Sequence, residues 1–191
     1  MNPMAATTPP RSRPPALALA TRVLPSPVGD LTLHAGAGGL RAVLFADPRH
    51  PLDVASLRRP TDVAGDAAAT ARMLDHAARE LNEFFAGHRR GFTVPLDPDG
   101  TDFQRTVWTA LSTIPYAATW SYGQLAATIG KPSASRAVGA ANGRNPISII
   151  VPCHRVIGQD GSATGYGGGL PAKRWLLDHE AKVAGLTLPG L

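Results

Sequence analysis

The chain has 191 residues, of which 43% are hydrophobic and 17% are charged, and it contains a single cysteine. A chain of this length can bury a hydrophobic core without disulfide bonds or structural metal ions. A single cysteine excludes both an internal disulfide framework and a multi-cysteine zinc cluster. No apolar run approaches the roughly 18 residues that a membrane-spanning helix needs. The composition is therefore typical of a soluble globular protein, with the cytoplasm as its expected location.

Two terminal segments are expected to lie outside the fold. Residues 1–20 are rich in Pro, Ala, Ser and Thr and contain no acidic residue, which predicts a disordered tail. Residues 186–191 are predicted to form a short C-terminal tail. Between the tails we predict an N-terminal domain over residues 21–95 and a C-terminal domain over residues 96–185, joined where prolines and a glycine cluster.

The N-terminal half reads as a small α/β unit. Short apolar runs in residues 21–44 are separated by Pro- and Gly-containing turns, which predicts two or three strands, and residues 48–65 are predicted to form a loop. A helix ended by Gly87 should follow. Its apolar stripe consists of Ala67, Ala71, Leu74, Ala78, Leu81 and Phe85. The histidines of this half have no metal-ligand spacing, so nothing in it is predicted to do chemistry.

The C-terminal half predicts a helix-turn-helix. Thr101 with Gln104 has the form of a capping box and opens a helix that Pro115 stops. Ser121 with Gln124 repeats the pattern and opens a short helix that Gly130 closes. Ser133 can cap a second helix over residues 136–142, and a last helix is predicted over residues 171–183 with Glu180 near its inward stripe, which comprises Trp175, Leu176 and His179.

The distribution of charge favours a nucleic-acid partner. Net charge is +5, and residues 103–159 contain no Asp or Glu, although an even spread of the 14 acidic residues would place about four there. The basic residues of this stretch are Arg105, Lys131, Arg136, Arg144 and Arg155. A surface without carboxylates would not repel the phosphates of a nucleic acid. The alternative is that the absence of acidic residues arises by chance in a sequence of low charge and has no functional meaning. Small residues in the second helix, including Gly139, allow close approach either to DNA or to a neighbouring helix.

Cys153 is the candidate nucleophile. A lone cysteine is usually an inert apolar residue, but this one follows a strand-like apolar run and Pro152, and precedes His154 and Arg155. A neighbouring imidazole or guanidinium can lower the pKa of a thiol or accept its proton. A histidine base needs a third group to hold its tautomer, for which Glu180 is the best candidate in this half.

These residues resemble the methylated-DNA–protein-cysteine alkyltransferase family. The resemblance covers almost the whole second half, in family order. It is carried by Gly100-Thr101-Asp102-Phe103-Gln104, Val107-Trp108, Ile114-Pro115-Tyr116, Ser121-Tyr122-Gly123, Arg136-Ala137-Val138-Gly139, Asn145-Pro146, Pro152-Cys153-His154-Arg155-Val156 and Gly165-Tyr166-Gly167-Gly168-Gly169-Leu170. It implies an α+β protein with an N-terminal ribonuclease-H-like α/β domain and a C-terminal helical, winged-helix-like domain whose helix-turn-helix enters the minor groove of double-stranded DNA.

The resemblance also implies a reaction. An alkyl group would pass irreversibly from the O6 atom of a flipped guanine, and from O4-alkylthymine as well, to Cys153, one lesion per molecule. No cofactor or metal is implied, and the protein is expected to be a monomer in solution; cooperative assembly on DNA is left open. The implied catalytic residues are Cys153, His154, Glu180, Asn145 and Tyr122. The implied DNA- and base-binding residues are Arg136 as the intercalating finger, Tyr122, Val156, Tyr166, Gly167, Ala137, Gly139 and Asn142.

The chain departs from the family pattern at two positions, and three alternative functions remain open. Ala117 stands where the family commonly has Gly, and Trp120 where it has a polar residue, so Trp120 either contacts DNA or packs inside the fold. A damage sensor would bind the lesion without transfer, but such sensors lack the cysteine. A cysteine hydrolase would turn over repeatedly. For a plain helix-turn-helix regulator, Cys153 would be dispensable.

Overall fold

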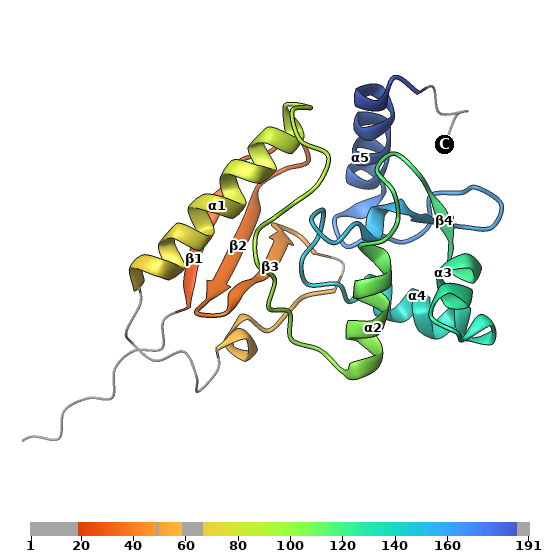
Figure 1. Ribbon diagram of the computed structural model, residues 1–191, viewed down its shortest axis with the longest axis horizontal. Helices are drawn as coiled ribbons and strands as arrows, with labels where there is room; N and C mark the ends of the chain where they lie inside the picture. The colour runs from red at the N-terminus through yellow and green to blue at the C-terminus, as the bar shows by residue number, and fades with distance from the viewer. Residues whose placement is uncertain (1–18, 49, 59–66, 187–191) are drawn as a thin grey trace, which may run out of the picture.

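The computed structural model describes residues 19–48, 50–58 and 67–186 (Figure 1). Most of the predicted N-terminal tail, part of the predicted loop and residues 187–191 lie outside the described residues. The tail prediction runs slightly too far, because Ala20 already belongs to the first strand.

Three antiparallel strands form the N-terminal sheet, as the sequence predicted. They are β1 (Ala20–Leu24), β2 (Leu31–Gly36) and β3 (Gly39–Phe45), in the order β1-β2-β3. The tight β2–β3 hairpin pairs Gly36 with Gly39, and the register shifts once between His34 and Ala35. Leu31, Leu33, Leu40 and Val43 are fully buried, so the sheet presents a continuous apolar face.

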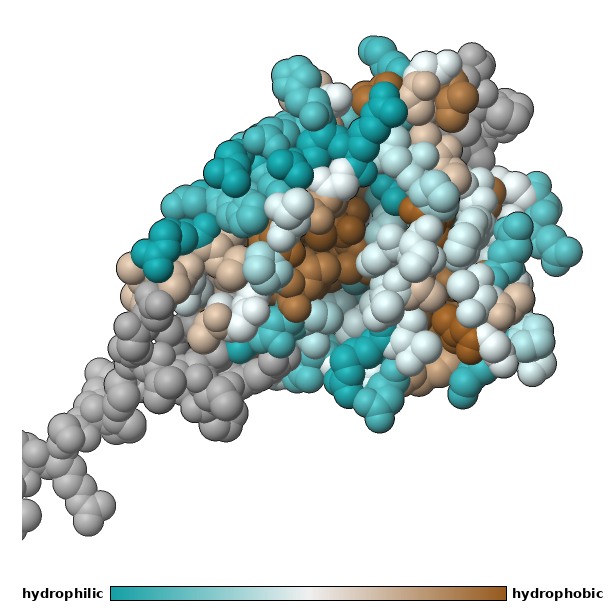
Figure 2. Space-filling model, in the orientation of Figure 1, coloured by the Kyte–Doolittle hydropathy of each residue, from teal (hydrophilic) through white to brown (hydrophobic). Residues whose placement is uncertain are grey.

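Helix α1 (Ala67–Phe85) covers this sheet and presents hydrophilic residues outward (Figures 1 and 2). Two residues of the predicted apolar stripe, Ala67 and Ala71, are exposed, so the buried face begins further along the helix than predicted. The residues that pack inward are Thr70, Leu74, Ala77, Ala78, Glu80, Leu81 and Phe84. Gly87 ends the helix with a φ of +76°, a conformation that glycine adopts without strain. The described part of the predicted loop contains a short 3₁₀ turn, η1 (Val54–Leu57).

The C-terminal half is mainly helical. Its elements are α2 (Asp102–Leu111), β4 (Trp120–Ser121), α3 (Tyr122–Thr128), η2 (Pro132–Ala134), α4 (Ser135–Gly143), η3 (Cys153–Arg155), β5 (Val156–Ile157) and α5 (Gly169–Ala184). Both predicted capping boxes form at the starts of α2 and α3. The predicted cap at Ser133 is wrong, because Ser133 lies inside η2 and α4 begins after Ala134 without a side-chain cap. Helices α3 and α4 pack together as the predicted helix-turn-helix.

Backbone hydrogen bonds join the sheet edge to the C-terminal half. The amide of Val43 on β3 donates to the carbonyl of Pro146 at 2.9 Å, and the amide of Ser148 donates to the carbonyl of Val43 at 3.3 Å. On the other side, His179 of α5 contacts the carbonyl of Phe84 at 2.8 Å. One hydrophobic core therefore runs through both halves. Within the described ranges, none of the helices combines the length and apolarity needed to cross a membrane.

Candidate active site

Cys153 lies at the start of η3, buried with 4% of its surface exposed. The strand-like run predicted before it is wrong. Residues 147–151 instead form a tight turn in which Ile149 has a φ of +73°, a left-handed conformation that costs a β-branched residue energy. The surrounding contacts must hold this turn in place.

The side chain of Asn145 provides much of that restraint. Its Nδ2 donates to the carbonyl of Val151 at 2.8 Å, and its Oδ1 accepts from the amide of Ile147 at 3.0 Å. The same Nδ2 lies 3.1 Å from Sγ of Cys153. Asn145 therefore fixes both ends of the turn and gives the sulfur a hydrogen-bond donor.

Glu180 of α5 gathers the polar groups behind the cysteine. Its Oε1 lies 2.9 Å from Nε2 of His154. Nε of Arg155 donates to both carboxylate oxygens, and Nη2 of Arg155 donates to Oε1. The amide of Ala117 donates to Oε2 at 2.9 Å. Burial alone would raise the pKa of Glu180, but the hydrogen bonds from His154 and Arg155 and the charge of Arg155 outweigh it and lower the pKa to about 2. Glu180 is therefore an anion at neutral pH.

The ionised Glu180 determines the tautomer of His154. An ionised carboxylate only accepts hydrogen bonds, so Nε2 carries the ring proton and Nδ1 has the free lone pair. Nδ1 is buried and has no hydrogen-bond partner among the described residues. Burial also lowers the pKa of His154, so the ring is neutral. The imidazole is thus oriented as a base with its accepting nitrogen unoccupied by protein.

Cys153 is a thiol in this state. Burial raises its pKa to about 11, and the hydrogen bond from Asn145 and the charge of Lys173 counteract this only in part. Arg155, which the sequence offered as a group that could lower the thiol pKa, is occupied by Glu180 and by the carbonyl of Ile114. Of the two predicted routes to a nucleophile, proton removal by a base is the one that this geometry favours.

The resemblance implies four other site residues, of which Tyr166 lies close enough to Cys153 to interact with it electrostatically. Val156 and Tyr166 are buried, Tyr122 is half-buried at the start of α3, and Gly167 is half-buried in a glycine-rich turn. The ring of Tyr166 meets that of His154 edge to face, with centroids 6.4 Å apart. The ring of Tyr166 therefore lies against the imidazole of His154 and near the sulfur.

The burial of the α4 residues indicates which of them are accessible to DNA. Arg136 and Ala137 are exposed, whereas Gly139 lies under the ring of Tyr122, where an added Cβ would sit 3.5 Å from the ring. Asn142 is only 3% exposed, and its Nδ2 points to the carbonyl of Cys153 at 3.5 Å. This position does not suit the direct DNA contact predicted for Asn142, because the helix turns it toward the core.

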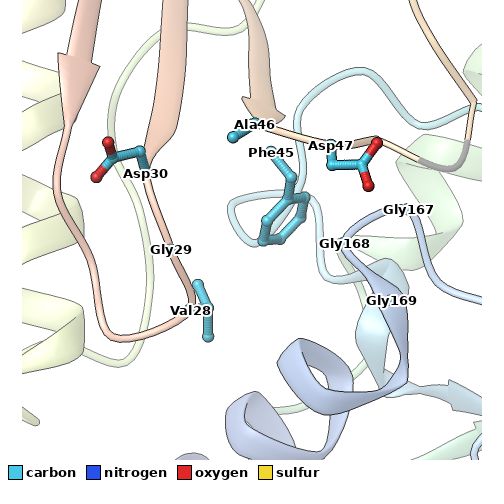
Figure 3. Close-up of a pocket in the computed structure, with 9 residues that line it drawn as sticks. All are labelled: Val28, Gly29, Asp30, Phe45, Ala46, Asp47, Gly167, Gly168 and Gly169. Carbon is cyan, nitrogen blue, oxygen red and sulfur yellow. The ribbon is translucent and has the colours of Figure 1, made fainter.

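Two residues near the site were missed by sequence reasoning. Lys173 of α5 is fully buried, and its spacing from Leu176, Leu177 and Glu180 on the inward helix face could have revealed it. Phe45 of β3 packs edge to face on Tyr166 at 5.5 Å and closes over Gly168 (Figure 3). Nothing in the sequence near Phe45 indicates this contact, because it joins distant segments.

The two departures from the family pattern have structural explanations. Ala117 has a φ of +60°, the left-handed conformation that glycine adopts most easily. Trp120 is half-buried against the core, so the packing alternative describes it. Among the residues that the structure describes, no group of three or more His, Cys, Asp or Glu side chains could hold a metal ion.

The fold and site together define a helix-turn-helix protein with a single buried cysteine nucleophile and a histidine–glutamate pair behind it. Known proteins share this plan. The pattern of the 6-O-methylguanine DNA methyltransferase ribonuclease-like domain matches residues 19–98, and that of the family's DNA-binding domain matches residues 102–182. The chain belongs to the 6-O-methylguanine DNA methyltransferase family.

Individual relatives agree over most of their length. The methylated-DNA–protein-cysteine methyltransferase of Mycobacterium bovis is 50% identical over 159 residues, which are 83% of this chain and 90% of the relative. That of Methanosarcina barkeri is 43% identical over 158 residues, covering 83% and 94%. The crystal structure of Mycobacterium tuberculosis OGT in complex with DNA aligns with a TM-score of 0.71 and 46% identity, covering 85% of this chain and 93% of that one.

Proposed function

We propose that this protein repairs DNA by direct reversal, moving an alkyl group from O6 of guanine to Sγ of Cys153. The observation that carries the proposal is the neutral, oriented His154 beside a buried Cys153 thiol, with Glu180 fixing the histidine proton on Nε2. The related proteins are named for transfer from methylated DNA to a protein cysteine, and one was crystallised with DNA. Site and family thus point to the same reaction.

The reaction begins with proton removal. A water molecule bridging Sγ and Nδ1 of His154 would carry the thiol proton to the imidazole, and the anionic Glu180 would stabilise the imidazolium that forms. The thiolate then attacks the alkyl carbon, so that an S–C bond forms as the C–O6 bond breaks. The electron pair of the broken bond stays on guanine, which regains a proton with the help of the Tyr122 hydroxyl.

Binding to double-stranded DNA presents the lesion to the buried sulfur. We propose that α4 enters the minor groove, with the exposed Arg136 filling the space of the flipped nucleotide and Ala137 lying close to the backbone. Tyr166 would then wall the base pocket, and backbone groups of Cys153, Val156 and Gly167 would read the guanine edge. O4-alkylthymine is a second substrate under the same proposal.

The reaction consumes the protein. The thioether product offers no easy leaving group, and the sequence contains no second cysteine that could resolve it. Each chain would act once, as a monomer in solution. We also propose a division into domains at residues 21–95 and 96–185, and a cytoplasmic location, since Cys153 must remain a free thiol and cytoplasm keeps thiols reduced.

Intact-protein mass spectrometry tests the proposal. Mixing the protein with an equimolar duplex that carries one O6-methylguanine should add about 14 Da, saturating at one methyl per chain. The Cys153→Ala variant should bind the duplex and gain nothing. Tight binding without a mass gain in the wild type would replace the repair proposal with damage sensing, and repeated turnover on an ester would favour a hydrolase.

A further inference from the structure

The side chain of Lys173 places an ammonium group in the protein interior. Its side chain is fully buried on α5, and no carboxylate in the described part of the chain forms an ion pair with it. Burial lowers its pKa to about 8, although the nearby Cys153 acts in the opposite direction. Burying a cation is costly unless hydrogen bonds or a charge compensate for it, so the contacts of this group require explanation.

The ammonium group binds two backbone carbonyls that are close in space and separated in sequence. Nζ lies 2.5 Å from the carbonyl oxygen of Val156 and 2.7 Å from that of Thr164. Residues 157–163 leave the site after Val156 and return to it at Thr164, with a hydrogen bond of 2.8 Å from the amide of Gly158 to the carbonyl of Ser162. Lys173 therefore joins the two ends of this loop.

Each end of the loop leads to a group of the proposed base pocket. The hydroxyl of Thr164 lies 3.4 Å from that of Tyr122. The carbonyl of Val156 has two lone pairs, of which Lys173 uses one, so a second remains for a donor on the guanine edge. A displacement of the ammonium group would release both walls of the pocket together.

We propose that Lys173 is a positioning residue of the alkyl-transfer site, which clamps Val156 to Thr164 and places a positive charge near the sulfur at neutral pH. The clamp holds the base pocket closed, and the charge stabilises the thiolate as it forms. Lys173 and Tyr166 interact electrostatically with Cys153, whereas His154 and Arg155 both bind Glu180. Among the cations of the site, Lys173 is the one that has no carboxylate partner in the described ranges. This inference rests on the proposed function.

The test compares Lys173→Met, which keeps length and loses charge, with Lys182→Met on the exposed face of the same helix. Single-turnover methyl transfer from the O6-methylguanine duplex is followed at several duplex concentrations. We expect Lys173→Met to lower the saturating rate about tenfold to a hundredfold, since a buried carbonyl that loses its partner is strongly disfavoured. Binding of an undamaged duplex should not change, and Lys182→Met should match the wild type.

A second readout separates positioning from a general loss of structure. The rate at which iodoacetamide alkylates Cys153 without DNA reports the thiolate fraction as a function of pH. In Lys173→Met the rate at a given pH below about 8, where Lys173 carries its charge, should fall about tenfold, and the two profiles should converge at higher pH, where the wild-type lysine is neutral. Lys173→Arg, which keeps the charge, should retain the wild-type profile even where its larger group slows transfer.

The outcomes are distinguishable. A wild type that transfers no methyl would refute the proposed function itself. A wild type that transfers normally, together with a folded Lys173→Met that has the same saturating rate and iodoacetamide profile, would refute the role of Lys173. If the variants do not fold, the ¹⁵N resonance of the wild-type ammonium group decides: slow proton exchange is expected for a clamped group, and exchange as fast as that of Lys182 would contradict it.

Discussion

Replacing Glu180 with glutamine removes a buried carboxylate that binds both His154 and Arg155. The glutamine side chain would be almost the same size and could still accept from His154 or from the amide of Ala117. It could not neutralise Arg155, a residue that is 7% exposed and whose guanidinium makes three contacts of 2.9 to 3.2 Å with the carboxylate. The substitution therefore tests the charge of Glu180 more than its shape.

The pKa of Glu180 sets the expected magnitude. A fall from the ordinary value of 4.5 to about 2 corresponds to about 3 kcal/mol of folding free energy, at about 1.4 kcal/mol per pKa unit. Because the folded-state pKa is depressed, this stabilisation is complete above the unfolded value of 4.5 and is lost as the pH falls toward 2. The free energy of unfolding of Glu180→Gln should therefore be about 3 kcal/mol lower at pH 7, with the difference shrinking between pH 4.5 and pH 2.

Urea unfolding of wild type and Glu180→Gln at pH 7, 5 and 3 measures the difference. Asp178→Asn is the matched control, since Asp178 is an exposed carboxylate on the same helix. Its free energy of unfolding should stay within about 0.5 kcal/mol of wild type. A loss in Glu180→Gln below about 1 kcal/mol at pH 7, or a loss that persists unchanged at pH 3, would contradict the stabilisation assigned to the Glu180 charge.

Three further substitutions test other parts of the structure. Ala117→Gly should raise the free energy of unfolding by about 0.5 kcal/mol in urea, because relief of the left-handed strain exceeds the added freedom of the unfolded chain; a loss would contradict the strain assigned to φ +60°. Gly168→Ala should cost about 1 to 3 kcal/mol in the same assay and slow methyl transfer, because its Cβ would lie 2.6 Å from the Phe45 ring; unchanged values would show that the turn yields freely. Arg136→Ala should keep its stability within about 0.5 kcal/mol and its iodoacetamide rate, yet lose at least about tenfold in transfer from duplex DNA; equal transfer would remove Arg136 from the DNA contact.

Local signals in the sequence predicted the helices well. The two capping boxes were readable because each consists of a side chain and an amide three residues apart. The end of α1 was readable for a similar reason, since Gly87 alone supplies the positive φ. Ser133 failed as a cap because Pro132 starts a 3₁₀ turn that carries the chain past it before α4 begins. Local chemistry therefore fixes most helix ends unless a neighbouring turn competes.

The sequence predicted which polar residues form the site, but it did not predict the backbone conformation and the protonation state found there. His154 and Glu180 were paired in advance by the logic of a histidine base, and they lie 2.9 Å apart. The turn at Ile149 was not predictable, because a β-branched residue there looks like a strand until the contacts of Asn145 are known. The thiol also keeps its proton, because complete burial outweighs the hydrogen bond from Asn145 and the charge of Lys173.

The N-terminal half looked chemically silent in the sequence, and its contribution to the site explains why. Val43 holds the segment before Cys153 through its amide and its carbonyl, groups that every residue except proline possesses. Such a contact leaves no mark in the side-chain pattern of either partner. Phe45 adds an aromatic contact to Tyr166, but a buried aromatic on a strand is what any core requires. The sheet thus supports the loop of the nucleophile from one side while α5 supplies Glu180 from the other, so the site depends on both halves although all the proposed chemical groups come from one.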